Sequence, residues 1–227
     1  MAGKILPPQL ITNARMLILC YEPADPRAVA ALLPPPLRPA RNKAIFLNQY
    51  VVDKPEQTSG FGSYSLTYIG PELAGYNADK MTQGRFWTHY LNSNPLMRNY
   101  VKERGVPAKP GETTLELKRG RLVATTYVNN KPIIRSTVAV GATMTIARGQ
   151  LRYINKVGRS FYDGRYPYVM PMAERLEVIS LEFLDPNHSI YALRPANPVK
   201  LTAPGLYTPA GTFCYPGGYE PMPKISG

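Results

Sequence analysis

Lys109 is a residue of this sequence whose surroundings could support chemistry, because it lies between Pro107 and Pro110 in the segment VPAKPG. Each proline fixes its own φ angle and restricts the residue before it, so the lysine amine is aimed more narrowly than on a free loop. An amine held against an apolar pocket has a lowered pKa and acts as a nucleophile or a base. The alternative is a solvated turn lysine that pairs with Glu103 or Glu112.

The two histidines, His89 and His188, lie far apart in the sequence and have no companions at metal-ligand spacing. On an expected strand, His89 shares a face with Trp87 and Leu91, and a histidine on an apolar face is more often a hydrogen-bonded core residue than a catalyst. His188 follows a turn in DPNHSIY, where we expect it to be exposed. The sequence has no glycine-rich phosphate loop and no GxSxG nucleophile elbow. We therefore expect no metal site and no cofactor.

The charge of the chain is strongly positive. Its 227 residues carry a formal net charge of +12, from 27 lysines and arginines against 15 aspartates and glutamates. This balance is found in nucleic-acid-binding proteins, but the basic residues are scattered and form no nucleic-acid-binding motif. A positive surface also attracts small anions. We therefore expect a small carbonyl or carboxylate compound as the partner, and no nucleic acid.

The sequence also indicates the cellular compartment in which we expect the protein. No apolar run approaches the roughly 18 residues of a membrane span, and the N-terminal segment MAGKILPPQL lacks the apolar stretch of a signal peptide. The two cysteines, Cys20 and Cys214, stand alone and fit neither a disulfide framework nor a metal site. We expect both thiols to be reduced and the protein to be cytoplasmic, without contact to a membrane.

The elements that must position these residues are mostly strands. The 24 prolines favour many short elements joined by stiff turns. Two capped patterns predict helices, over residues 25–33 with Asp25 as N-cap, and over residues 94–104 with Asn94 as N-cap and Gly105 at the end. Apolar segments predict strands over residues 14–23, 43–53, 63–73, 84–94, 113–120, 121–130, 131–140, 150–160, 176–185 and 188–196.

Two turns define the middle of the predicted sheet. Arg119–Gly120 and Asn129–Asn130 separate three of the expected strands, which predicts an antiparallel meander over residues 113–140. We find no internal repeat, no linker and no break in composition. Residues 1–227 are therefore expected to form a single domain of the mainly β (α+β) class, built on a curved antiparallel sheet with short helices.

A family resemblance adds to this interpretation. From Tyr90 onward, the segment YLNSNPLMRNYVKERGVPAKPGETTLELKRGRLVAT resembles the acetoacetate decarboxylase family, which has a YLDN-P-A segment, a short helix, a PKK motif and a strand ending in LVGT. Upstream, YEPADPRAVAALLPPPL resembles a family helix and TSGFGSYSLTY resembles a family loop. The resemblance covers roughly residues 13–125, with a looser match at YDG, residues 162–164. It implies a cone-like β-barrel and a homo-oligomer.

The resemblance also places the family's reactive groups. In the family, the first lysine after the proline forms a Schiff base with the substrate ketone, and the second lysine lowers its pKa. Here Ala108 occupies the first position and Lys109 the second. The family glutamate falls on Leu66. The family arginine falls on Ala14, with Arg15 one place along, and an offset of one residue in a strand moves a side chain to the other face.

These departures shape the expected function. We expect a divergent, acetoacetate decarboxylase-like enzyme of the lyase, cyclase or isomerase type, not a true acetoacetate decarboxylase. It would act on a carbonyl compound, such as a polyketide-like or secondary-metabolite precursor, by cyclisation, dehydration, isomerisation or aldol-type chemistry without a Schiff base. One alternative is a Schiff-base lyase that uses Lys109, and the other is a non-catalytic ligand-binding domain. The expected catalytic residues are Lys109, His89, Tyr64 and Arg15, and the expected substrate-binding residues are Ala108, Leu66 and Trp87.

Overall fold

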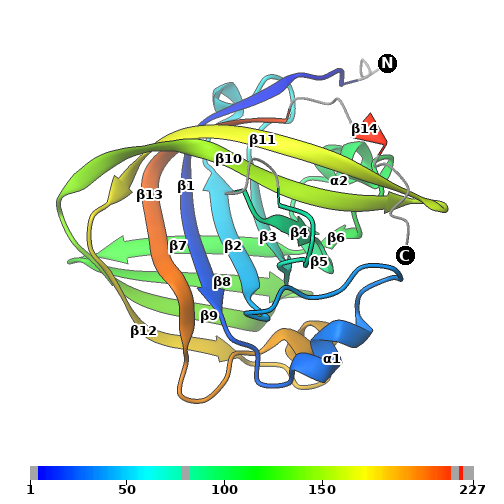
Figure 1. The fold of residues 1–227 in the computed structure, drawn as a ribbon. Coiled ribbons are helices and arrows are strands. Elements are labelled where there is room, and N and C mark those ends of the chain that lie inside the picture. Colours follow the sequence, from blue (N-terminus) through cyan, green and yellow to red (C-terminus); the bar gives the residue numbers. More distant parts are fainter. Residues whose placement is uncertain (1–4, 78–81, 216–219, 222–227) are drawn as a thin grey trace.

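Strands dominate the backbone of the computed structural model, which describes residues 5–77, 82–215 and 220–221 (Figure 1). Residues 1–4, which belong to the segment inspected for a signal peptide, lie outside the described residues. Within the described part of the chain, no helix is long and apolar enough to cross a membrane. The strands are β1 (Gln9–Tyr21), β2 (Ile45–Val52), β3 (Tyr64–Pro71), β4 (Gly84–Phe86), β5 (His89–Asn92), β6 (Ala108–Pro110), β7 (Glu112–Lys118), β8 (Arg121–Val128), β9 (Lys131–Val140), β10 (Met144–Val157), β11 (Ser160–Ala173), β12 (Leu176–Phe183), β13 (Leu201–Tyr215) and β14 (Glu220–Pro221).

The larger sheet has ten strands and curls strongly. Its order is β4-β10-β11-β13-β1-β2-β3-β5-β6, with β14 paired to β11. All its pairings are antiparallel except β4 with β10 and β5 with β6. The long β10–β11 ribbon crosses over the interior that β1, β2 and β3 enclose (Figure 1). The expected mainly β class with a curved antiparallel sheet is confirmed.

The predicted meander forms most of the second sheet. This sheet has the order β12-β9-β8-β7. Arg119, Asn129 and Asn130 adopt positive φ angles of 50°, 51° and 63° at the two turns. Asparagine and glycine tolerate this left-handed conformation better than most residues. The expected strand order and both turns are therefore confirmed.

Two hydrophobic clusters lie on opposite faces of the large sheet. The first fills the interior of the curl and includes Tyr50, Tyr90 and Tyr153. The second joins the large sheet to the small one and includes Leu17 of β1, together with Leu122 and Ile134 of the meander. Successive strand residues point to opposite faces, so neighbouring residues such as Met16 and Leu17 of β1 belong to different clusters.

Both predicted helices are confirmed. The first is α1 (Pro26–Ala31), where the Asp25 side chain accepts hydrogen bonds from the backbone N–H groups of residues 27 and 28. The second is α2 (Pro95–Lys102), where Asn94 accepts from residues 96 and 97. Gly105 has a φ of +77° directly after α2, which is the left-handed conformation that glycine adopts without strain.

The predicted strand over residues 188–196 is wrong. Residues 188–196 contain the 3₁₀ helix η2 (Ser189–Leu193) instead of a strand, because the His188 side chain caps it by accepting from the Ile190 N–H group. His188 itself is half-buried, so the expectation that it is exposed is also wrong. A second 3₁₀ turn, η1 (Pro55–Gln57), lies after β2.

The predicted strand over residues 84–94 is broken into two. β4 pairs with β10, and β5 pairs with β3. The break at Trp87 and Thr88 interrupts the regular alternation of side chains between the two faces of the sheet. Trp87 therefore belongs to the interior cluster, while Leu91 belongs to the cluster between the two sheets. The break passes close to Gly70, where a Cβ atom would lie 1.7 Å from the Phe86 carbonyl oxygen. The expectation that Trp87 and Leu91 share a face is therefore wrong.

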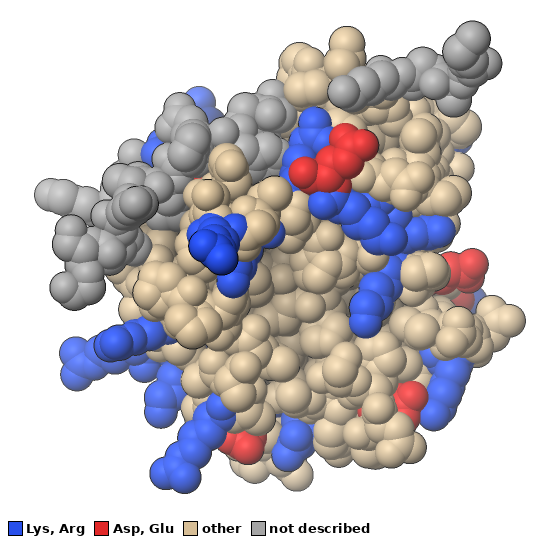
Figure 2. All heavy atoms as spheres, turned by 90° about the vertical axis from the view of Figure 1, so that its right-hand side faces the viewer, with Lys and Arg blue, Asp and Glu red and all other residues tan. Residues whose placement is uncertain are grey.

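The surface charge is spread rather than concentrated. On the face that Figure 2 shows, Lys and Arg side chains are scattered and outnumber Asp and Glu. This agrees with the dispersed basic residues of the sequence.

Candidate functional site

Three positions where the resemblance predicts charged side chains belong to one buried cluster inside the curled sheet. Ala14, Leu66 and Ala108 are 0%, 0% and 3% exposed, and all belong to the interior cluster. They come from β1, β3 and β6, which are distant in sequence. The interior that would hold an arginine, a glutamate and a lysine is therefore apolar at these positions.

Lys109 lies on the opposite face of β6 from Ala108. In the parallel pairing with β5, Ala108 is opposite Tyr90 and Lys109 is opposite Leu91. Tyr90 belongs to the interior cluster, and Leu91 belongs to the layer between the sheets. Lys109 is exposed. Its amine therefore faces away from the interior.

Arg15 also lies outside the interior. Its Nη2 is 2.6 Å from Asp53 Oδ1, and its Nε donates to Asp53 Oδ2 at 2.8 Å. Its Nη1 donates to the carbonyl oxygen of Leu115. The hydrogen bond from Arg15 lowers the pKa of Asp53. Arg15 is thus engaged with β7 and with the end of β2, as its offset of one residue from Ala14 requires.

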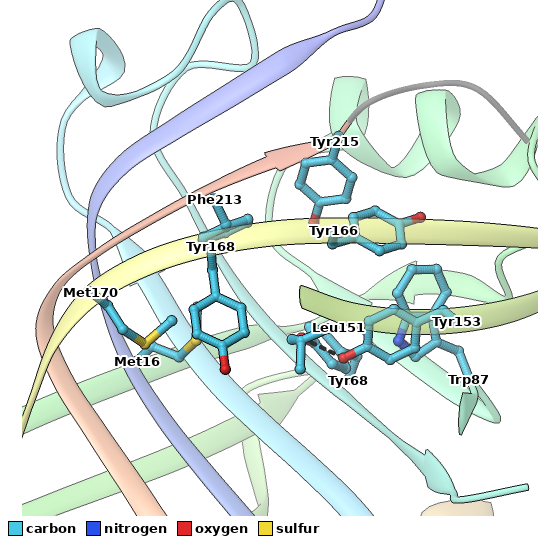
Figure 3. A pocket seen from close by; sticks show the side chains of 10 residues that line it. All are labelled: Met16, Tyr68, Trp87, Leu151, Tyr153, Tyr166, Tyr168, Met170, Phe213 and Tyr215. Atoms are coloured by element: carbon cyan, nitrogen blue, oxygen red, sulfur yellow. Dashed lines mark hydrogen bonds between the residues drawn. The ribbon is translucent and has the colours of Figure 1, made fainter. Parts of the chain in front are cut away.

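The interior contains a small aromatic cavity, and Figure 3 shows the side chains around it. Its volume is ≈ 20 Å³, which is room for about one water molecule. The Trp87 and Tyr153 rings are stacked, with centroids 4.2 Å apart and planes at 24°. The lining residues are Met16, Tyr68, Trp87, Leu151, Tyr153, Tyr166, Tyr168, Met170, Phe213 and Tyr215. None of these side chains carries a formal charge at neutral pH.

Buried phenol groups form hydrogen-bonded chains in this interior. The Tyr50 hydroxyl lies 2.9 Å from that of Tyr64 and 3.0 Å from that of Tyr215, and Tyr215 lies 3.3 Å from Tyr90. In a second chain, the Tyr153 hydroxyl donates to that of Tyr68 at 2.9 Å. The phenol groups of this interior are therefore neutral polar groups that are bonded to one another.

Burial keeps these phenols protonated. It raises the pKa of Tyr68 to about 12. Burial likewise raises the pKa of Tyr50, Tyr64, Tyr90 and Tyr153 well above the ordinary value. The hydroxyls therefore donate and accept hydrogen bonds at neutral pH, but none is a phenolate base.

Among the described residues, the buried polar atoms without a hydrogen-bond partner include two that belong to neighbours of Tyr68. They are the indole Nε1 of Trp87 and the side-chain Oδ1 of Asn48. The Asn48 amide group itself donates to the Tyr68 hydroxyl at 2.7 Å. Buried polar atoms are nearly always paired. The unpaired indole N–H belongs to a side chain that lines the cavity, and it lacks the partner that a ligand or a bound water molecule would supply.

His89 and Lys109 come together at a different place. Both line a cleft on the other side of Trp87, with a volume of ≈ 430 Å³. The His89 Nε2 lies 2.9 Å from the Ser189 hydroxyl. Burial, followed by the nearby His188 and Lys109, lowers the pKa of His89 to about 4. His89 is therefore a neutral imidazole at physiological pH.

The candidate residues of the sequence thus divide into three groups. Tyr64, Leu66 and Ala108 belong to the interior, although none of the three lines its cavity. Lys109 and His89 line the outer cleft, and Trp87 lines both spaces. Arg15 lies in neither.

Sequence reasoning missed most of the cavity wall. Its aromatic residues on β10 and β11 alternate with residues that point outward, as in Tyr166, Tyr168 and Met170. This spacing of two, together with the 16 tyrosines of the chain, is the signal that could have found them. Among the described residues, no three histidine, cysteine or carboxylate side chains are grouped as a metal site would require.

Comparison with known proteins relies on structure alone. No family model matches the sequence, and no curated protein matches it. A structure of acetoacetate decarboxylase matches with a TM-score of 0.71 and 14% identity, over 96% of this chain and 90% of the other. The enduracididine biosynthesis enzyme MppR, complexed with the condensation product of pyruvate and imidazole 4-carboxaldehyde, matches with a TM-score of 0.69 and 14% identity, over 98% and 92%.

A third solved structure agrees with these two. An acetoacetate decarboxylase-like enzyme from Sphingomonas wittichii RW1 matches with a TM-score of 0.63 and 13% identity, over 97% of this chain and 95% of the other. The likeness spans nearly the full length of every chain. It covers the curled sheet and the strands that surround the interior cavity. This protein therefore has the fold of the acetoacetate decarboxylase-like enzymes.

Proposed function

We propose that the protein is an enzyme that binds a small carbonyl compound in the aromatic interior and activates it without a Schiff base. The observation that carries this proposal is the unpaired indole N–H of Trp87 at the wall of a cavity lined by neutral side chains. The carbonyl oxygen of a substrate accepts from this indole. The hydroxyls of Tyr68 and Tyr153 lie in the same wall as further polar partners.

The expected reactions share one electronic demand. In cyclisation, dehydration, isomerisation and aldol-type steps, negative charge develops on a carbonyl oxygen as an enolate or alkoxide forms. Fixed hydrogen-bond donors in a water-poor site stabilise that charge. The lining side chains contribute hydrogen bonds and aromatic surface, and no lysine, histidine, aspartate or glutamate belongs to them. Positioning and oxygen activation are therefore the chemistry that this cavity supplies.

The structural relatives support a carbonyl substrate. Acetoacetate decarboxylase acts on a keto acid, and MppR was solved with a condensation product of pyruvate. Both share the fold that surrounds the cavity, at 14% identity. The apolar Ala108 and the aromatic lining favour a more apolar carbonyl compound than acetoacetate in this protein.

Entry of a substrate requires movement of the wall. The enclosed volume of ≈ 20 Å³ is too small for an organic molecule. Leu151 and Tyr168 are half-buried at the outer side of the cavity, on β10 and β11. Rotation of these two side chains opens the interior without breaking a strand pairing.

Fluorescence of Trp87 tests binding directly, because it is the only tryptophan of the chain. We would titrate the protein with 2-oxo acids and β-diketones of increasing apolar length, and with the matching hydroxy compounds. The carbonyl compounds should change the emission saturably, and the hydroxy compounds should bind more weakly. No saturable change with any carbonyl compound would contradict the proposal.

A matched pair of variants locates the effect. Tyr153→Phe removes a hydroxyl from the cavity wall, and it should weaken carbonyl binding by roughly tenfold. Tyr21→Phe removes an equally buried hydroxyl, which donates to the Leu193 carbonyl oxygen at 2.9 Å outside the cavity, so binding should stay unchanged. Equal affinities of the wild type and Tyr153→Phe would exclude the hydroxyl from the site.

The non-catalytic binding domain is the second candidate. It is favoured by the same lack of ionised side chains around the cavity. Mass spectrometry of each bound carbonyl compound after incubation with the protein separates the two. A changed product supports the enzyme, and saturable binding with an unchanged compound supports the binding domain.

A further inference from the structure

The outer face of β5 and β6 carries a cleft that is distinct from the aromatic interior. Its volume of ≈ 430 Å³ falls within the range of small-molecule sites. It is bounded by Leu32, which directly follows α1, and by residues from β4, the β4–β5 connection, β5, β6, β10, η2 and the loop after α2. The lining residues are Leu32, Phe86, Trp87, Thr88, His89, Tyr90, Leu91, Gly105, Pro107, Lys109, Lys156 and Ser189.

Two lysines from distant segments give this cleft its charge. Lys109 comes from β6 and Lys156 from β10, and the described residues that line the cleft include no aspartate or glutamate. Gly105 brings the two segments together, because a Cβ atom there would lie 2.2 Å from the Lys156 carbonyl oxygen. A side chain at position 105 would therefore push β10 away from the loop that precedes Lys109.

Among the described residues, neither Lys109 nor Lys156 forms an ion pair, and the Lys156 ammonium lies 5.9 Å from the centroid of the Phe161 ring. Burial lowers the pKa of His188, and the nearby Asp185 opposes this shift. Its carboxylate, however, lies 3.0 Å from the Lys131 ammonium in an ion pair. The charge on Lys109 lowers the pKa of both His89 and His188. The field in the cleft therefore favours an anion.

The hydrogen bonds of His89 hold its ring in one tautomer of the neutral imidazole, which forms part of the cleft wall. The Thr88 hydroxyl donates to the Ile69 carbonyl oxygen at 3.0 Å, so it accepts from His89 Nδ1, 3.2 Å away. His89 Nε2 then accepts from the Ser189 hydroxyl at 2.9 Å. The imidazole adds no charge of its own, and the two ammonium groups remain as the partners for an anion.

The rest of the lining is apolar. Leu32, Phe86, Trp87, Leu91 and Pro107 contribute hydrocarbon and aromatic surface. Inorganic anions gain nothing from such surface, whereas burial of a hydrocarbon body is favourable. We propose that this cleft binds a small organic acid with an apolar body, whose carboxylate pairs with Lys109 and Lys156 while its body packs against these side chains. The inference does not depend on the function proposed for the interior.

The histidines provide a reporter for this cleft. The chain contains only two; His89 lines the cleft, and the His188 ring centroid lies 6.1 Å from that of His89. Imidazole proton signals of the untagged full chain would be followed by NMR during titration with 3-phenylpropionate. Both histidine signals should move saturably. The neutral 3-phenylpropionamide, which has the same body, should bind at least about tenfold more weakly, since it lacks the charge-assisted contacts.

Charge-removing variants test the assignment of the lysines. The double variant Lys109→Gln and Lys156→Gln should bind 3-phenylpropionate at least about tenfold more weakly than the wild type. Lys118→Gln is the matched control, since it removes the same charge from a lysine whose side chain is 83% exposed on β7, and it should bind as the wild type does. The Lys109→Gln single variant, at an exposed position, keeps the test available if the double variant does not fold.

Three outcomes would overturn the proposal. The first is equal affinity for 3-phenylpropionate and 3-phenylpropionamide, which would mean that the cleft recognises only the apolar body of the ligand. The second is an affinity for inorganic phosphate as high as that for 3-phenylpropionate, which would mean that the cleft recognises only the negative charge of the ligand. The third is unchanged binding in a folded lysine variant. Tyr153→Phe, which alters the interior, should leave the histidine shifts intact, so failure here is distinct from failure of the carbonyl site.

Discussion

Ala108 and Lys109 are neighbours on β6 and project into different environments. The alanine is 3% exposed in the interior cluster, and the lysine is exposed beside a cleft on the other face. A displacement of one residue along a strand exchanges the two faces. The amine nearest to the expected Schiff-base position therefore lies outside the cavity where carbonyl compounds are proposed to bind.

Ala108→Lys should place an amine in the apolar interior, where Ala108 is buried without lining the cavity. Burial among aromatic rings lowers the pKa of such a lysine, so that it attacks ketones at neutral pH. After incubation with pyruvate and borohydride, intact-mass measurement should show a covalent adduct in Ala108→Lys and none in the wild type. The variant should also melt at a lower temperature, because the longer side chain overpacks the interior. A wild-type adduct that maps to Lys109 would instead support the Schiff-base alternative.

Tyr50→Phe should destabilise the protein by about 1–3 kcal/mol. The variant removes the hydroxyl that lies within hydrogen-bonding distance of both Tyr64 and Tyr215, and buried hydroxyls that lose a partner are costly. Tyr90→Phe is the matched control, since its hydroxyl makes one longer contact of 3.3 Å. Urea denaturation should show a smaller loss for Tyr90→Phe. The opposite order would mean that Tyr50 is not the centre of this network.

Stability should fall as the pH falls from about 6.5 to about 4. The pKa of His89 is lowered from 6.5 to about 4 in the folded state. In this window the unfolded chain takes up a proton that the folded chain does not, so the free energy of unfolding decreases by roughly 3 kcal/mol at most. His188, whose pKa is also lowered, acts in the same direction. Above pH 6.5 neither state is protonated at His89, and its contribution is constant.

The variant His89→Gln isolates this effect. Denaturation curves recorded at several pH values between 4 and 7 should show a flatter dependence for His89→Gln than for the wild type. Asp53, whose pKa is lowered from 3.8, loses its contribution only below this window. Parallel curves for the two proteins would show that His89 is not the titrating group.

Arg15→Gln should have little effect on either site. The Arg15–Asp53 pair is partly exposed, with side chains 32% and 42% accessible, and such pairs contribute less than about 1 kcal/mol. The residue faces away from the interior, so the Trp87 fluorescence response to carbonyl compounds should match that of the wild type. A variant that folds but no longer binds carbonyl compounds would contradict this and would support the expected role of Arg15 as a catalytic residue.

A homo-oligomer remains our expectation, and light scattering should give a mass above the 25.2 kDa of one chain. β4 pairs with β10 only at residues 152–154, so in the described part of the chain residues 144–151 have a strand on one side only. Ile146 is 69% exposed on this edge. Ile146→Glu should lower the oligomer mass if the edge is buried between copies. A monomer mass for the wild type at micromolar concentration would refute the expectation.

Local signals in the sequence were sufficient for the helices and for the meander. Asp25 and Asn94 cap helices through bonds to residues two and three positions away. Such bonds depend on short range only. The turns at residues 119–120 and 129–130 likewise form from their own backbone preferences. These elements, and the alternation of β-strands, could therefore be predicted without knowledge of the fold.

Local signals failed where a distant contact decided the conformation. Residues 84–94 have the pattern of one strand, yet they pair first with β10 and then with β3. The 15 residues of β13 include Pro204 and Pro209 and were not predicted as a strand, although β13 lies between β11 and β1. Proline argues against a strand in the sequence because it cannot donate a backbone hydrogen bond. Only the pairing of β13 with β1 and β11 shows that these prolines are tolerated within the sheet.

Through its resemblance to the family, the sequence by itself predicts that Ala108, Leu66 and Ala14 stand where the family has charged residues. It also placed Lys109 and Arg15 one position away from two of them. Only the tertiary structure decided that the three apolar residues meet in one interior and that Lys109 joins Lys156 in an outer cleft. The physical reason is that strand register and sheet curl, set by contacts between distant segments, determine which face each side chain occupies and which other residues it meets.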